Sequence, residues 1–172
     1  IELGLVGSEM CIRDRINPKP VQNPMPLWVG GSAEAAIERT ARWGTGWQAG
    51  IETAAEIQPV ILRIKERCAE LDREIDEDHF GAGFAVRFGS HSEPIVSKYN
   101  EIMRERLGKD PKEYSAIGDA DTMLELLKEF HEAGAHKFIL RPIADGHADM
   151  IHQTKLLIEE LMPRIAKLNN ED

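Results

Sequence analysis

The feature of this sequence that most constrains its fold is the repeated alternation of short apolar segments with amphipathic ones. Apolar segments of strand length lie at residues 27–29, 46–49, 84–88 and 137–141. Elsewhere, apolar residues recur every three or four positions, which predicts helices at about residues 33–43, 57–75, 93–106, 119–133 and 149–168. Residues 108–116 are expected to form a loop. Four strand–helix units in a row predict an α/β protein with a parallel sheet and helices outside it.

The length of the chain leaves two parallel-sheet architectures open. The sequence has 172 residues, whereas a complete (β/α)8 barrel needs about 250. Apolar periodicity alone does not separate a doubly wound sheet from four units of a larger barrel. The chain has no repeat of 20–50 residues, no low-complexity tract and no linker, so we expect one domain.

The first residues carry a different signal. Residues 5–15 read LVGSEMCIRDR, which resembles one reading frame of a transposon-end adapter used in DNA sequencing. We therefore expect residues 1–16 to be a non-native tail and residues 17–172 to form the domain. Outside that tail the one cysteine is Cys68, which lies among apolar helix positions, so we expect a buried thiol and no disulfide.

The charge balance limits the classes of partner. The chain has 21 basic and 30 acidic side chains, a formal net charge of −9. A general nucleic-acid binder or a membrane-surface protein relies on basic patches, so we expect neither partner. No apolar run approaches the roughly 18 residues of a membrane helix. Two cysteines form no disulfide framework, which favours a reducing, cytoplasmic location.

The segment with the clearest chemical potential is the first strand-to-helix turn, PLWVGGSAEAA at residues 26–36. Gly30 and Gly31 let the backbone approach a ligand closely, and Ser32 is placed to cap the helix that follows. The amides at a helix start favour an anion, so the turn is a candidate phosphate site. It is neither a P-loop nor a complete dinucleotide fingerprint, and the same residues also suit an ordinary turn.

Two longer stretches resemble a known family. Residues 19–47, KPVQNPMPLWVGGSAEAAIERTARWGTGW, and residues 117–143, IGDADTMLELLKEFHEAGAHKFILRPI, resemble the C-terminal half of the luciferase-like monooxygenases. Those enzymes are flavin- or deazaflavin-dependent (β/α)8 proteins, and the resemblance implies strands five to eight of a TIM barrel. Thr45 stands where that family usually has Asp, and we expect the loss of a local hydrogen bond there.

The resemblance also implies a cofactor and an activity. It implies a flavin-dependent oxidoreductase or monooxygenase that uses FMN or coenzyme F420 on a small organic substrate, with O2 as co-substrate for an FMN enzyme. The phosphate would lie on Gly30, Gly31 and Ser32, and Gly46 and Trp47 would approach the ring or its side chain. We expect a homo-oligomer for the full-length protein, and an inactive fragment that binds cofactor poorly for this chain alone. The alternative is a non-catalytic α/β domain that binds a phosphate ligand.

Several further residues are candidates with two interpretations each. Arg87 and Arg141 lie near the carboxyl ends of strands, where they would hold a phosphate or an anionic substrate, or else pair with a carboxylate or reach solvent. The acidic loops at residues 76–79 and 145–149 lack the spacing of a metal site, so we expect no metal and assign Asp145 or Asp149 to a helix cap. Trp28 and Trp43 are expected to be core or helix-packing residues.

Overall fold

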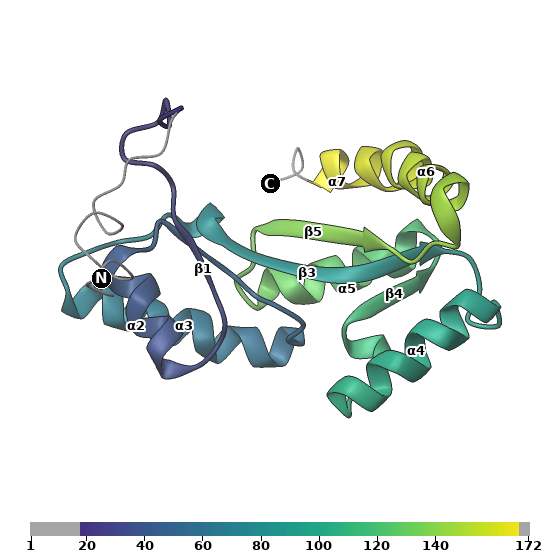
Figure 1. The fold of residues 1–172 in the computed structure, drawn as a ribbon, viewed down its shortest axis with the longest axis horizontal. Helices are drawn as coiled ribbons and strands as arrows, with labels where there is room; N and C mark the ends of the chain where they lie inside the picture. Colours follow the sequence, from purple (N-terminus) through teal and green to yellow (C-terminus); the bar gives the residue numbers. More distant parts are fainter. Residues whose placement is uncertain (1–17, 169–172) are drawn as a thin grey trace, which may run out of the picture.

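The computed structural model describes residues 18–168, so the expected tail at residues 1–16 lies outside the described part of the chain. The strands are β1 (Trp28–Gly30), β2 (Gly46–Gln48), β3 (Phe80–Phe88), β4 (Ser115–Gly118) and β5 (Lys137–Pro142). The helices are α2 (Glu34–Trp43), α3 (Ala54–Glu70), α4 (Pro94–Leu107), α5 (Ala120–Glu132), α6 (Gly146–Leu156) and α7 (Met162–Leu168). A π-helix of five residues, Leu157–Leu161, joins α6 to α7. Figure 1 shows how these helices and strands are arranged.

All strands of the sheet are parallel, and β3 lies at its centre. Successive residues of a strand direct their backbone hydrogen bonds to opposite sides of it. The hydrogen-bond partners of β3 therefore show on which side of β3 each neighbouring strand lies. The carbonyl of Gly81 and the N–H of Ala85 bond toward β2 and β4, whereas the carbonyls of Phe80 and Val86 bond toward β5. β2 and β4 therefore share one side of β3, at its two ends, and β5 lies on the other side.

The resulting lateral order of the four main strands is β1, β2, β3, β5, which is also their order along the chain. A doubly wound sheet reverses its strand order at a switch point and carries helices on both faces, whereas a barrel keeps the order and places the helices outside. Here the order does not reverse. The expected α/β fold, about four strand–helix units of a TIM barrel, is therefore confirmed.

The main core lies on the face of β3 that meets the helices. Phe84 is fully buried there, and its ring stacks on Phe130 of α5 with a centroid distance of 5.3 Å. Cys68 of α3 is 3% exposed and free, as expected, and burial raises the pKa of its thiol. This cluster also contains Ile37, Ala41, Ile57, Ile61, Ile64, Phe80, Ala82, Val86, Met123, Leu126 and Leu127. Helices α2, α3 and α5 thus share one face of the sheet.

The opposite face of β3 carries small residues, and Ala85 there packs with Val96 of α4, Ile117 and Ile143, whereas the part of this face at Ile139 is open in the described chain. The ring of Trp28 packs where side chains of Gly46 and Gly81 would otherwise lie, since a Cβ at either glycine would come within 3.1 Å of it. On β5 the residues alternate between exposed and half-buried, and Ile139 on the open face is 54% exposed. In a complete barrel this face would be the interior.

Gly83 on this face provides a test of the strand packing. A Cβ at this position would lie 2.9 Å from the carbonyl oxygen of Ile139 and 3.2 Å from its Cβ, both on β5. Because backbone must move to admit it, Gly83→Ala should lower the free energy of unfolding by about 1–3 kcal/mol. Urea denaturation measures this, with Gly30→Ala as the control, since its Cβ would meet only ordinary contacts. Equal midpoints for the two variants would contradict the register of β3 against β5.

Several predicted elements are corrected by the structure. The expected loop at residues 108–116 was wrong at its end, because Ser115 begins strand β4, which pairs with the last four residues of β3. Strand β3 begins at Phe80, four residues before its predicted start, since its glycines fit between β2 and β5 instead of ending the strand. Helix α3 ends at Glu70, although Ile75 beyond it is buried in the core. Trp43 is 63% exposed, which contradicts the core interpretation for this residue.

Candidate functional site

The turn after β1 runs through Gly31 directly into helix α2. Gly31 has a φ of +99°, a left-handed conformation that glycine adopts without strain. Helix α2 begins at Glu34, and Ala33 at its N-cap supplies no side-chain hydrogen bond. The first amides of a helix have no partner within it, so this helix start presents donors that no cap side chain occupies.

Ser32 does not cap this helix, so that prediction was wrong. Its hydroxyl donates to Oε1 of Glu52 at 3.0 Å, while Oε2 of Glu52 accepts the N–H of Gly50 at 2.6 Å. Glu52 follows strand β2 and reaches the turn from 20 residues away, which no local pattern in the sequence indicates. The carboxylate therefore holds the serine away from the helix amides.

Gly46 and Trp47 take a different part from the one predicted. Both are buried, and Trp47 is fully so. The indole N–H of Trp47 donates to the carbonyl of Gly31 at 2.8 Å, so this side chain supports the turn from inside the core. Gly46 lies against the ring of Trp28. Direct approach of Trp47 to a ligand is therefore not what the structure shows.

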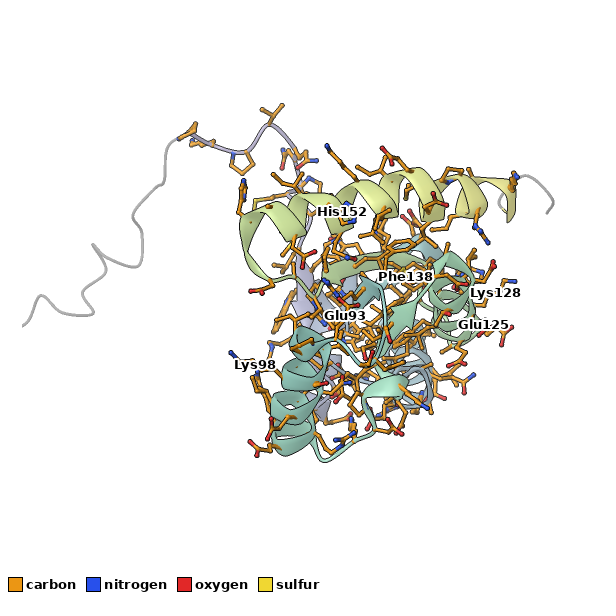
Figure 2. All side chains as sticks on the ribbon, turned by 90° about the vertical axis from the view of Figure 1, so that its right-hand side faces the viewer. Glu93, Lys98, Glu125, Lys128, Phe138 and His152 are labelled. Atoms are coloured by element: carbon orange, nitrogen blue, oxygen red, sulfur yellow. The ribbon has the colours of Figure 1, made fainter. Side chains whose placement is uncertain are left out.

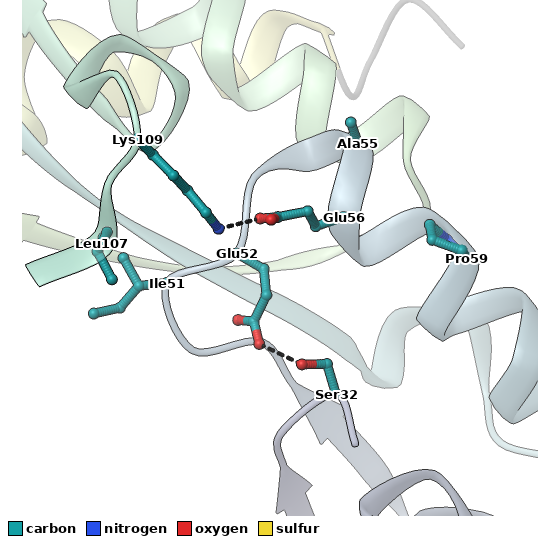
Figure 3. Close-up of a pocket in the computed structure, with 8 residues that line it drawn as sticks. All are labelled: Ser32, Ile51, Glu52, Ala55, Glu56, Pro59, Leu107 and Lys109. Atoms are coloured by element: carbon teal, nitrogen blue, oxygen red, sulfur yellow. Dashed lines mark hydrogen bonds and ion pairs between the residues drawn. The ribbon is translucent and has the colours of Figure 1, made fainter. Parts of the chain in front are cut away.

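A groove of about 560 Å³ opens beside the turn (Figure 3). Across it, Nζ of Lys109 lies 2.6 Å from Oε2 of Glu56, and this ammonium is the main cause of a lowered pKa for the Glu56 carboxyl. We call this groove the turn groove. It is lined by Ser32, Ile51, Glu52, Ala55, Glu56, Pro59, Leu107 and Lys109.

The turn groove brings groups that would favour a phosphate together with groups that would oppose one. Ser32 lines the groove with its hydroxyl, and the uncapped start of α2 and the exposed backbone of Gly31 lie beside it. Lys109 adds a positive charge that is paired with Glu56. The carboxylates of Glu52 and Glu56, which also line the groove, oppose an anion, and that of Glu52 does so directly beside Ser32. A phosphate on this turn would therefore take the Ser32 hydroxyl from Glu52.

Arg87 lies at the carboxyl end of β3 and is buried in an ion-pair network. Its Nη2 is 2.7 Å from Oε2 of Glu93, its Nη1 is 2.8 Å from Oδ2 of Asp149, and Nη1 also donates to the carbonyl of Ile143 at 2.7 Å. The interpretation in which Arg87 pairs with a carboxylate is thus the observed one. The network ties the starts of α4 and α6 to β3. Gln153 adds to it by bonding both the N–H and the carbonyl of Phe88.

Arg141 occupies a different environment. Its Nη2 donates to the carbonyl of Gly83 at 3.1 Å, and its side chain lines a second groove, between α4 and the strand ends. The two candidate arginines therefore do not form a joint anion clamp: Arg87 is held by carboxylates, and Arg141 faces the second groove.

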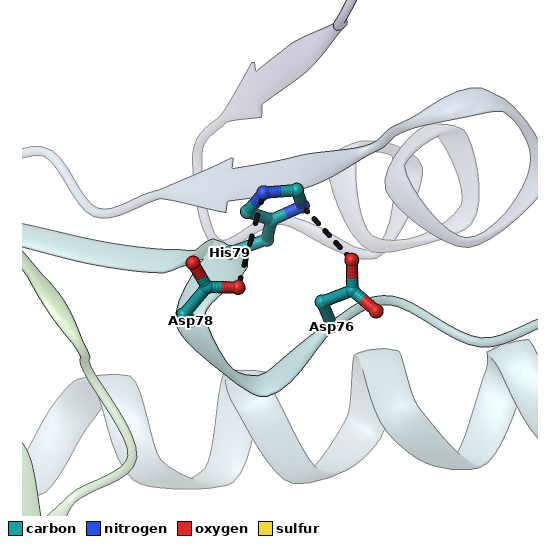
Figure 4. A group of neighbouring side chains, drawn as sticks. All are labelled: Asp76, Asp78 and His79. Atoms are coloured by element: carbon teal, nitrogen blue, oxygen red, sulfur yellow. Dashed lines mark ion pairs between the residues drawn. The ribbon is translucent and has the colours of Figure 1, made fainter.

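The two acidic loops carry structural interactions. Asp76, Asp78 and His79 cluster at the amino end of β3, with each carboxylate 3.9 Å from a ring nitrogen of the histidine (Figure 4). Asp76 and Asp78 are largely exposed, with 80% and 65% of their side chains accessible. In the other loop, Asp145 makes no side-chain cap, and Asp149 accepts the N–H of Asp145 as well as pairing with Arg87.

Thr45 corrects a further expectation. Its hydroxyl accepts the N–H of Leu27 at 2.7 Å, so the strand approach keeps a side-chain hydrogen bond at this position. Sequence reasoning missed three side chains that hold this region together, Glu52, Glu93 and Gln153, each of which bonds a residue brought close by the fold. Within residues 18–168, no helix is both long and apolar enough to cross a membrane.

Comparison with known proteins places these features in a family. No curated protein sequence matches the chain. One similar solved structure is an F420-dependent secondary alcohol dehydrogenase in complex with an F420–acetone adduct, which is 16% identical in sequence with a TM-score of 0.62. The match covers 81% of this chain and 48% of the dehydrogenase chain. A monooxygenase from Streptomyces bottropensis is 14% identical with a TM-score of 0.64, covering 87% and 51%.

A third similar structure is the oxygenating constituent of 3,6-diketocamphane monooxygenase from Pseudomonas putida in complex with FMN. It is 13% identical with a TM-score of 0.59, covering 80% of this chain and 48% of its own. The chain thus spans about half the length of the solved structures that it matches. The family model for luciferase-like monooxygenases matches residues 12–137. The chain belongs to the luciferase-like monooxygenase family.

Proposed function

We propose that this chain supplies the phosphate-binding half of a flavin- or F420-dependent oxidoreductase that acts on a small organic substrate. The observation that carries the proposal is the uncapped start of α2 directly behind the left-handed Gly31, next to an open groove. Support comes from similar structures that hold an F420–acetone adduct or FMN. We expect the class of reaction to be monooxygenation or hydride transfer.

The residues of the turn would bind and orient the cofactor. The amides from Gly31 onward would donate to the phosphate, and the Ser32 hydroxyl would join them after leaving Glu52. Trp47 would keep the Gly31 carbonyl fixed from beneath, which sets the direction of the neighbouring amides. When bound, FMN or F420 would supply the redox chemistry, and the carboxyl ends of the strands would position the substrate beside it.

The alternative of a non-catalytic phosphate-binding domain has less support. In the form considered from the sequence, it requires a complete doubly wound sheet, and the strand order of this sheet does not reverse. A phosphate on the turn is common to both proposals. A flavin or deazaflavin ring that contacts the strand ends distinguishes the enzyme.

Glu52→Gln tests the turn. The substitution removes the negative charge beside Ser32 and keeps one side-chain oxygen as an acceptor, so we expect the affinity for FMN to rise about threefold. Amide chemical shifts of residues 31–35, followed by NMR during titration with FMN, measure the dissociation constant. Glu125→Gln on α5 is the control and should leave it unchanged. An unchanged or weaker affinity in Glu52→Gln would contradict a phosphate on this turn.

A further inference from the structure

A second groove of about 420 Å³ lies between α4 and the carboxyl ends of β3 and β5. Figure 1 shows α4 beside the ends of these strands. The walls are mainly apolar: Ile95 and Ile102 come from one side of α4, and Ile143 follows β5. Ile102 is 52% exposed, so part of this apolar wall is open to solvent. We call this the α4 groove.

The charged groups that line the α4 groove are all positive. Lys98 of α4 and Arg141 of β5 line it, together with the ring of Tyr99, and its lining contains no carboxylate. This is a local exception in a chain with a formal net charge of −9. Arg141 is oriented by its bond to the Gly83 carbonyl, and a guanidinium has five N–H donors, so this bond leaves others for a ligand.

The α4 groove adjoins the turn groove. Ile51, in the segment after β2, lines both of them. Helix α4 also contributes to both, through Leu107 on one side and Met103 on the other. A ligand in the α4 groove would therefore lie next to a cofactor held at the Gly31 turn, at the same end of the sheet.

We infer that the α4 groove is the substrate end of the site and that it takes a small organic anion with an aliphatic chain. The acid group would meet Lys98 and Arg141, and the chain would lie along Ile95 and Ile102. This inference rests on the proposed function, because it names the substrate class of the same site. Charge complementarity selects an anion, and the aliphatic walls select a chain over a compact polar ion.

The test uses the chain without any flavin, so that it is independent of the cofactor. Octanoate is the probe, octanamide is its neutral counterpart with the same chain, and acetate is the anion without the chain. Binding is followed by NMR on the amides of α4 and on residues 141–144. We expect octanoate to bind about tenfold more tightly than either of the others.

Variants then separate the charges from the walls. Lys98→Gln and Arg141→Gln should each weaken octanoate binding, about threefold and tenfold, and leave octanamide unchanged. Lys128→Gln is the matched control, because Lys128 on α5 lies on the opposite side of the molecule from Lys98 (Figure 2). Lys98 is exposed, so its replacement does not threaten the fold.

Each outcome bears on the inference. Equal binding of octanoate and octanamide would overturn it, as would shifts outside the α4 groove or no octanoate binding at all. If FMN shifts the Gly31 turn while octanoate fails, the substrate inference falls and the proposed function stands. If octanoate binds in the α4 groove while FMN leaves the turn unshifted, the proposed cofactor site fails and the anion site stands on its own.

Discussion

Replacing Arg87 with Met is expected to lower the free energy of unfolding by about 3–5 kcal/mol. The guanidinium is 9% exposed and is the shared partner of Glu93 and Asp149. Removing it leaves two neighbouring carboxylates and the carbonyl of Ile143 without their common donor. For a chain of this length the melting temperature should fall by about 10 °C.

A matched surface variant shows whether this loss of stability is specific to Arg87. Arg63→Met removes pairs of 3.4 Å with Glu34 and Glu66 from a side chain that is 42% exposed, so it should change the stability by less than about 1 kcal/mol. A similar loss in both variants would contradict a special role for Arg87.

The pH profile gives a second readout of the same network. The bond from Arg87 lowers the pKa of Glu93, while the N–H of Asp145 and then Arg87 lower that of Asp149. A lowered carboxyl pKa stabilises the fold above its ordinary value of about 4 and ceases to do so as the pH falls through the lowered value. The difference between wild type and Arg87→Met should therefore shrink from pH 5 to pH 3. If the difference in stability between wild type and Arg87→Met stayed constant over this range, the loss would not come from the pairing of Arg87 with Glu93 and Asp149.

Phe84→Ala is the second large effect. Phe84 is fully buried between the sheet and α5, where it stacks on Phe130, so its removal leaves a cavity as well as losing buried apolar surface. We expect a loss of about 3–5 kcal/mol in the free energy of unfolding, measured by urea denaturation.

Phe138→Ala is the comparison for Phe84. Phe138 is the same residue type on β5 but is only half-buried at the margin of this core (Figure 2). We expect its loss to be about half as large, because burial sets the effect. If Phe138→Ala were the more damaging of the two, the core would not be centred on β3 as described.

Much of the fold follows from local patterns in the sequence. The burial of Cys68 and the start of α5, where Asp119 accepts the N–H of Thr122 at 3.0 Å, are local features that the sequence predicts correctly. Strand β4 is not such a feature. It consists of Ser115–Gly118, too short to show alternation, and it is a strand because β3 extends far enough to pair with it.

The candidate site is less predictable, for the same physical reason. Gly30 and Gly31 mark the turn, but the partner of Ser32 is 20 residues away, where folding brings the Glu52 carboxylate within 3.0 Å. Arg87 lies at a strand end as expected, yet its environment is set by Asp149, 62 residues further along. Such pairings depend on the assembled sheet and helices, and local propensity does not encode them.

The central claim, a phosphate site at the Gly31 turn, is tested most directly by comparing FMN with riboflavin, which lacks the phosphate. Both are titrated into the isotopically labelled chain, and the amide shifts of residues 31–35 are followed by NMR. We predict phosphate-dependent shifts there with FMN, weak in affinity because the chain spans half of its structural relatives, and none with riboflavin. Equal shifts with both flavins, or shifts that avoid the turn, would contradict the claim.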